Sequence, residues 1–351
     1  MTSVSRRDFL GSAAAVSVAL GLPKTFVSSA LANAPALNPR KLPFPNDAFG
    51  TYEPTISADL NSIYFARFAS TGDPSVTGRS NIFVVRRTNT SNEWPGKLED
   101  WGPAERLPDT VNGDVSKLGD KLSNLEPWIT PDGQTLYFQS NREGAGGELG
   151  IWEAHAQPDG TWSEAQPVAG GNINTAGTEH CFIPFDLPGE PEAMSIIGIR
   201  PRSEGAPPTT DLYTTRNVNG EWQPLQRYED QLLDSIALKC RFNVVTKDDL
   251  TLGVVTVHDF GKFHTLLFVH YDPETKKWKG PVVEAPFNDW NIDGGCPNFD
   301  AAGNIMIWSA GYDRGPDVIT GGESGAGGVY DLYWLPTSEV IDYYKKAAGI
   351  G

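Results

Sequence analysis

The sequence has little of what several common chemistries require. It contains three cysteines and five histidines among 351 residues. It has no glycine-rich phosphate-binding loop, no Gly-x-Ser-x-Gly nucleophile motif and no His-Glu-x-x-His metal motif. Nucleotide chemistry, serine-hydrolase chemistry and zinc-protease chemistry therefore have no support.

Long apolar runs are also absent. The run that ends at Leu22 is too short, and too rich in Ala, Ser and Gly, for a membrane anchor. Together with Ser5-Arg6-Arg7-Asp8-Phe9-Leu10 before it and Ala30-Leu31-Ala32 after it, this run resembles a twin-arginine export signal. We expect residues 1–32 to be this signal peptide and the mature protein to be periplasmic.

Positive charge is scarce. The chain has 28 Lys and Arg against 44 Asp and Glu, and loss of residues 1–32 would take the net charge from −16 to −18. A chain this acidic repels phosphate backbones and anionic lipid surfaces. We therefore expect no nucleic-acid partner and no membrane insertion of the mature form. In an oxidising compartment, an odd number of cysteines leaves at least one unpaired in a monomer.

The sequence does contain an internal repeat. In residues 126–154 a short segment ends at the turn Pro131-Asp132-Gly133, and two β-prone runs follow, separated by a polar, glycine-rich loop. This order of features predicts an antiparallel meander. Further copies begin near residues 53, 180, 239 and 296.

A tryptophan announces a fourth strand in each of the first four copies. These residues are Trp101, Trp162, Trp222 and Trp278. The fifth copy lacks such a strand, but residues 41–47 resemble the segment that starts at Arg106. We predict an all-β, five-bladed β-propeller over residues 38–335, closed by this N-terminal strand so that no sheet edge is left open. Residues 336–351 should form a short C-terminal helix. Two stacked sandwiches, the alternative, would not explain the displaced strand.

The repeat also resembles a known family. Residues 126–154 closely match xPxxSPDGxxLYFxSNRxGGxGxxDIW, a signature similar to the WD40-like (PD40) repeat of TolB-type periplasmic propellers. Residues 53–85, 178–213 and 296–334 match it more loosely. The resemblance implies an exported propeller; many such proteins bind other proteins or envelope polymers, and only some are enzymes.

The first strand of each blade lines the channel of a propeller. Aligning the copies through Pro54 and Pro127 places Glu53, Glu126, His180 and Cys296 in one ring, with Lys239, Cys240 or Arg241 from the fourth copy. One interpretation is structural, with the carboxylates accepting hydrogen bonds from amides of the neighbouring blade.

Three chemical interpretations compete with it. Glu53 and Glu126 are candidate glycosidase acids. His180 or His258 is a candidate general base, with Lys239 or Arg241 neutralising an acidic substrate. The set His180, Cys181, Cys240 and Cys296 suits copper or zinc. Metal and cofactor therefore stay open.

The ends of the second strands supply further candidates for ligand binding. They are Arg67, Asn141, Arg142, His258 and Tyr312. Arginines at such positions suit bidentate binding of a carboxylate. We expect an envelope propeller that binds a partner protein or a small polar or acidic ligand at its central channel. The alternative is a periplasmic hydrolase or lyase that uses Glu53, Glu126 and His180 on a carbohydrate-like substrate.

The export prediction can be tested directly. Replacing Arg6-Arg7 with Lys-Lys should leave the protein in the cytoplasm, because the twin-arginine pathway recognises this pair. Fractionation followed by immunoblotting measures the outcome. Undiminished export of the Lys-Lys variant would contradict the predicted route.

Overall fold

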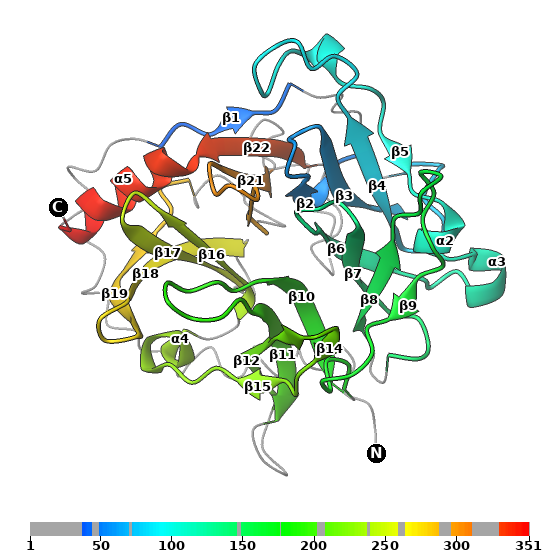
Figure 1. Cartoon of the computed structure of the whole chain (residues 1–351). Helices are drawn as coiled ribbons and strands as arrows, with labels where there is room; N and C mark the ends of the chain where they lie inside the picture. Colours follow the sequence, from blue (N-terminus) through cyan, green and yellow to red (C-terminus); the bar gives the residue numbers. More distant parts are fainter. Residues whose placement is uncertain are drawn as a thin grey trace.

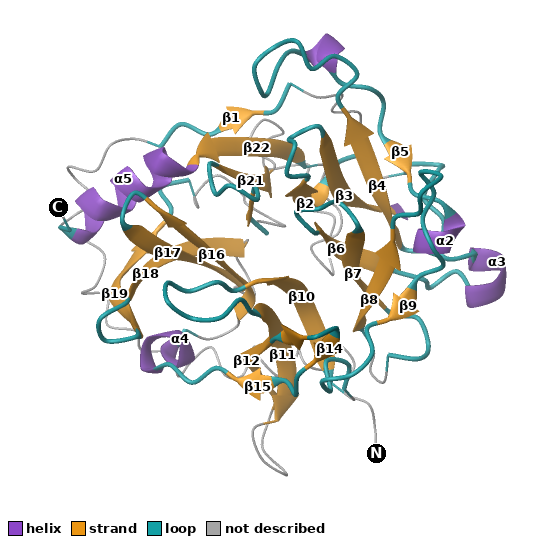
Figure 2. Cartoon of the chain, viewed as in Figure 1, coloured by secondary structure: helices purple, strands orange, loops and turns teal. Residues whose placement is uncertain are grey.

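The computed structural model describes residues 37–43, 49–69, 72–145, 149–175, 177–201, 208–236, 239–258, 264–287, 296–310 and 330–350. Over these residues the chain is an all-β, five-bladed propeller. Five four-stranded sheets surround a central axis, and the helices lie at the rim (Figures 1 and 2). The predicted fold class is therefore confirmed.

The first four sheets follow chain order from the inner strand outwards. The first blade comprises β2 (Tyr52–Ile56), β3 (Ser62–Phe68), β4 (Ser80–Arg86) and β5 (Glu105–Arg106). The second comprises β6 (Asn124–Ile129), β7 (Thr135–Ser140), β8 (Gly150–His155) and β9 (Gln166–Pro167). The third comprises β10 (Thr178–Pro184), β11 (Met194–Pro201), β12 (Pro208–Thr215) and β15 (Gln226–Arg227). The fourth comprises β16 (Lys239–Lys247), β17 (Leu250–His258), β18 (His264–Asp272) and β19 (Lys277–Glu284).

The fifth blade takes its outer strand from the other end of the chain. Its order is β20 (Asn298–Phe299), β21 (Ile305–Ala310), β22 (Asp331–Pro336) and then β1 (Arg40–Lys41). Arg40 pairs with Trp334 and Lys41 with Tyr333. The next amide, that of Leu42, donates to the Leu332 carbonyl at 2.9 Å. Closure by an N-terminal strand is confirmed, although the strand is shorter than predicted and residues 44–48 lie outside the described residues.

Short helices and one extra hairpin complete the described chain. They are η4 (Leu98–Asp100), α2 (Asp109–Asn112), α3 (Val115–Leu118), α4 (Gln231–Ser235), α5 (Thr337–Ala348) and the hairpin of β13 (Asn217–Val218) with β14 (Glu221–Trp222). The C-terminal α5 buries Val340, Ile341 and Tyr344 against the fourth and fifth blades. Among the described residues, no helix combines the length and apolarity that crossing a bilayer needs.

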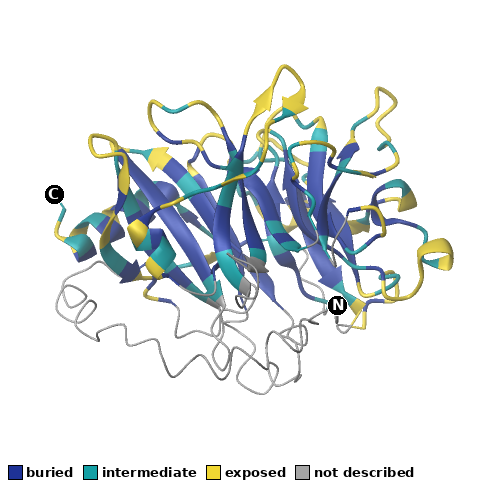
Figure 3. Ribbon diagram, turned by 90° about the horizontal axis from the view of Figure 1, so that it is seen from below, coloured by how far each residue is buried: buried dark blue, intermediate teal, exposed yellow. Residues whose placement is uncertain are grey.

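The hydrophobic core lies between the blades. Side chains alternate between the two faces of each strand, so Tyr64 packs towards the second blade while Phe65 packs towards the fifth. Figure 3 shows the buried strands running side by side through the disc, with exposed residues mainly in the loops. The four repeat tryptophans pack into these interblade clusters, as predicted, and precede or begin the fourth strand of their blade.

Ring closure should contribute strongly to stability. Leu42 is 1% exposed and packs between the first and fifth blades, so Leu42→Ala should lower the free energy of unfolding by about 2–5 kcal/mol. Arg40→Ala is the matched control, because its ion pair with Glu339 joins side chains that are 43% and 40% exposed and should contribute about 1 kcal/mol or less. Urea unfolding measures both, and equal effects would contradict the importance of this packing.

Candidate functional site

The inner strands of the first three blades share one backbone irregularity. The pairing register shifts between β2 and β3, between β6 and β7, and between β10 and β11. Within each shift one residue has a positive φ: Glu53 (54°), Glu126 (51°) and Cys181 (55°). A bulge with an extra residue re-aims a side chain, and positive φ is uncommon for residues other than glycine. The recurrence places these three side chains at equivalent positions around the channel.

The other two blades supply cysteines at this level. Cys240 lies inside the register shift of β16, and Cys296 lies just before β20. One carboxylate oxygen each of Glu53 and Glu126 and the Cys296 sulfur lie within 4.8 Å of one another. We call Glu53, Glu126, Cys181, Cys240 and Cys296 the channel ring. It contains every cysteine of the chain.

Hydrogen bonds connect the channel ring from blade to blade. The Glu126 amide donates to Glu53 Oε2 at 2.8 Å, and the Cys181 amide donates to Glu126 Oε2 at 2.7 Å. The Cys181 thiol donates to the Cys240 carbonyl at 3.4 Å. The structural interpretation of the carboxylates is therefore correct for one oxygen of each.

A buried cation accompanies the ring. Arg241 is fully buried, and its Nε donates to Asn243 Oδ1 at 3.1 Å. Its Nη1 and Nη2 have no hydrogen-bond partner in the described part of the chain. Burial acts to lower the pKa of Arg241, but the nearby Cys181, Cys296, Glu126 and Glu53 raise it above its ordinary value. Arg241 therefore remains charged and balances the carboxylates electrostatically.

The same environment sets the protonation of the ring. Burial acts to raise the pKa of Glu126, but His180, Arg241 and the hydrogen bond from Cys181 bring it below its ordinary value. Burial raises the pKa of the Cys181 thiol well above its usual range. Hydrogen bonding with Cys296, together with burial, does the same for the Cys240 thiol. At neutral pH the ring therefore holds an ionised Glu126 beside protonated thiols.

His180 lies beside the ring. Its Nδ1 is 3.6 Å from Glu126 Oε1, so the two form an ion pair when the imidazole is protonated. Gln139 Nε2 lies 3.1 Å from the same Nδ1. If the amide donates there, the neutral ring carries its proton on Nε2. The His180 side chain is 14% exposed, so this pair combines an ionised carboxylate with a proton-carrying group.

One position of the ring differs from the predicted alignment, and another that the alignment left open is now defined. The alignment placed His180 in the ring, whereas Cys181 occupies the equivalent position and His180 precedes it. It left the fourth blade open among Lys239, Cys240 and Arg241, and the structure places Cys240 at the bulge. The bulge explains why the alignment was off by one residue. It inserts one extra residue into the strand, and this changes which side chain faces the channel.

The ring geometry can also be judged as a metal site. Carboxylate oxygens and a thiolate are ligands that zinc accepts. Arg241 already places one positive charge beside Glu53, Glu126 and Cys296, which offsets part of the negative charge that would attract a metal ion. We assign no metal to the ring.

Two of the three arginines predicted to bind ligand, Arg67 and Arg142, are enclosed by protein, as is Arg241. Arg67 is 3% exposed, forms an ion pair with Asp73 at 2.8 Å and stacks over Phe83. Arg142 donates to Asn124 Oδ1 at 3.1 Å and stacks over Trp152, and burial lowers its pKa to about 10. Binding of a ligand by either arginine would require it to leave these partners.

The remaining candidates are spread over the molecule. Lys239 is buried and donates to the Leu233 carbonyl at 3.0 Å and the Ile236 carbonyl at 2.5 Å. Asn141 accepts from the Ser123 amide and donates to the Lys121 carbonyl, each at 2.8 Å. His258 ends β17, and Tyr312 lies outside the described residues. Ligand binding by these four stays a prediction.

The lowered pKa of Glu126 predicts how stability depends on pH. A carboxylate with a depressed pKa in the folded state stabilises the fold above its unfolded pKa, ordinarily 4.5, and this contribution is lost as pH falls through the folded value. Glu126→Gln should therefore destabilise most near pH 7, and the difference from the wild type should shrink towards pH 3. Thermal unfolding between pH 3 and 7 measures this, with the exposed Glu105→Gln as control. A difference that does not change with pH would contradict the assignment.

Comparisons with known proteins identify the architecture. No protein-family model matches the chain, and no curated protein matches its sequence. The structure is similar to a GH43 endo-arabinanase from Bacillus licheniformis, with a TM-score of 0.51 and 15% identity over 84% of this chain and 95% of that one. An α-L-arabinofuranosidase from Podospora anserina in complex with cellotriose has a TM-score of 0.46 and 12% identity, over 87% of this chain and 95% of that one. At such identities the likeness concerns the fold alone: the chain has a five-bladed propeller fold that glycoside hydrolases also use.

Proposed function

We propose that the protein is a hydrolase that acts on a carbohydrate-like substrate beside its channel ring. The observation that carries the proposal is the pairing of Glu126 with His180. The carboxylate is held ionised, and the imidazole 3.6 Å away can accept and return a proton. Such a pair is suited to general acid–base catalysis, which typically contributes about 10²–10⁴-fold to a rate.

Glu53 takes a different role from Glu126 in this proposal. Inverting glycosidases need roughly 6.5–9.5 Å between two carboxyl groups to hold a water, whereas retaining ones use about 5–5.5 Å. The ring brings one oxygen of Glu53 within 4.8 Å of one oxygen of Glu126, which is short of the separation of an inverting pair. Glu53 accepts a hydrogen bond from the Glu126 backbone amide and is therefore a positioning residue. Glu126 and His180 are the groups that exchange protons with water or substrate.

The proposed substrate class rests on the polarity of the channel. Ionised, amide and imidazole groups line or adjoin the ring, which suits a substrate rich in hydroxyl groups. The fold shared with the endo-arabinanase makes arabinan a reasonable first substrate to test. Export through the twin-arginine pathway, and the TolB-type relationship, would place this activity in the cell envelope, and both stay predictions.

A second candidate function is binding without catalysis. It is favoured by the commitment of one oxygen of Glu53 and one of Glu126 to interblade amides. Under this alternative the ring is mainly structural and the ligand is retained unchanged. An envelope protein as the partner has no specific observation in its favour.

Turnover separates the two candidates. Glu126→Gln preserves an acceptor for the Cys181 amide but removes the basic carboxylate, so kcat should fall about 10²–10⁴-fold while substrate binding remains. Release of reducing sugar from arabinan, and of nitrophenol from aryl glycosides, measures activity, and calorimetry measures binding. The surface variant Glu105→Gln should match the wild type. Equal turnover by Glu126→Gln would contradict the catalytic role, and wild-type binding without turnover would favour the second candidate.

A further inference from the structure

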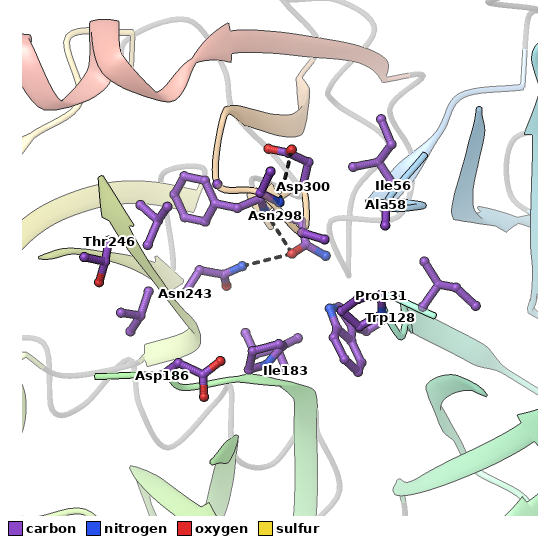
Figure 4. A pocket seen from close by; sticks show the side chains of 18 residues that line it. Ile56, Ala58, Trp128, Pro131, Ile183, Asp186, Asn243, Thr246, Asn298 and Asp300 are labelled. Carbon is purple, nitrogen blue, oxygen red and sulfur yellow. Dashed lines mark hydrogen bonds between the residues drawn. The ribbon is translucent and has the colours of Figure 1, made fainter. Parts of the chain in front are cut away.

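A cavity of about 260 Å³ lies at the other end of the inner strands from the channel ring. Every blade contributes to its wall through the end of its inner strand: Ile56, Ile129, Ile183, Val245 and Phe299. The turn residues Ala58, Pro131 and Asp300 surround it further (Figure 4). We call it the mouth cavity.

One polar group in the mouth cavity lacks a partner. Asn298 is 3% exposed, and its Oδ1 accepts from the Phe299 amide at 3.0 Å and from Asn243 Nδ2 at 3.4 Å. Its Nδ2 is buried with no hydrogen-bond partner among the described residues. In Figure 4 the amide lies between Asn243 and the side of the cavity formed by Trp128. A buried donor without a partner destabilises the protein, so a ligand oxygen that accepts from it would be favourable.

The other lining groups define the chemistry of such a ligand. Asp186 is exposed at the rim, and its Oδ1 accepts from the Ala193 amide at 3.1 Å, so Oδ2 is the acceptor that it offers. Both oxygens of Asp300 accept from backbone amides, Oδ1 from Ile305 at 2.6 Å and Oδ2 from Ala302 at 3.3 Å. No lysine or arginine lines the cavity as described, so an anion finds no countercharge. Isoleucine, proline and tryptophan side chains supply apolar walls. The ligand must therefore accept and donate hydrogen bonds, carry no negative charge and have apolar surface.

We propose that the mouth cavity is a binding site for one ring of a neutral sugar or cyclic polyol. A ring hydroxyl oxygen accepts from Asn298 Nδ2, another hydroxyl donates to Asp186, and the C–H face packs on the apolar wall. This site differs from the channel ring and does not depend on hydrolysis there. Asn243 connects the mouth cavity to the channel ring, because its side chain donates a hydrogen bond to Asn298 and accepts one from Arg241 Nε.

Calorimetric titration of the purified protein with D-xylose, L-arabinose, D-glucose and myo-inositol tests the site. At least one probe should bind the wild type. Asn298→Asp keeps the acceptor oxygen but removes the Nδ2 donor, and should weaken binding of that probe about tenfold or more. Ala58→Trp should weaken it to the same extent. Ala58 is exposed at the rim, so its enlargement blocks entry without disturbing the core. Asp159→Asn, in an exposed turn of the second blade, is the control and should bind normally.

The ring variant separates this site from the proposed active site. Glu126→Gln should bind the probe as the wild type does, whatever its turnover. Loss of probe binding in Glu126→Gln together with normal binding in Ala58→Trp would place the sugar in the ring and overturn the inference. Failure of all four probes to bind the wild type would also overturn it, with no bearing on hydrolysis of arabinan.

Discussion

The hydrogen bonds that join each inner-strand carboxylate to the amide of the next blade are the constraint on which the centre of this propeller depends. Glu53 binds the Glu126 amide, and Glu126 binds the Cys181 amide. Hydrogen bonds to charged groups contribute about 1.5–3 kcal/mol each. They also fix the bulge that aims each side chain inward, so the position of the candidate site follows from the way the blades are connected.

Two carboxylates at one level, of which Glu126 is buried, require compensation, and Arg241 of the fourth blade supplies one positive charge. Removing one partner of a buried ion pair costs about 3–5 kcal/mol, because the other charge remains uncompensated. Cys181, Cys240 and Cys296 complete the ring as small side chains, and the raised pKa values of Cys181 and Cys240 keep those two thiols protonated. Stability and the proposed chemistry therefore depend on the same side chains, so the effect of Glu126→Gln on folding has to be measured beside its effect on turnover.

The architecture was more predictable than the site. Hydrophobic alternation, turns and recurring tryptophans depend on local sequence, and they were sufficient to predict five blades and the displaced strand. Membership of the ring depends on the bulge, which changes by one residue which side chain faces inward; hence Cys181 replaced His180. The roles of Arg67 and Arg142 depend on partners distant in the sequence, such as Trp152 for Arg142. Asn298 gave no sequence signal, because its importance lies in a donor left without a partner.

The two ends of the channel favour the same kind of ligand for different reasons. At the ring, the cation that an acidic ligand would need is Arg241, but it is fully buried and faces two carboxylates. At the mouth cavity, the charged groups that line the described wall are Asp186 and Asp300. An acidic ligand would therefore meet negative charge at both ends, in a chain whose net charge is already −16. A neutral, hydroxyl-rich ligand avoids this repulsion and can use the amide, imidazole and carboxylate groups, so the electrostatics favour the polar over the acidic ligand among those expected from the sequence.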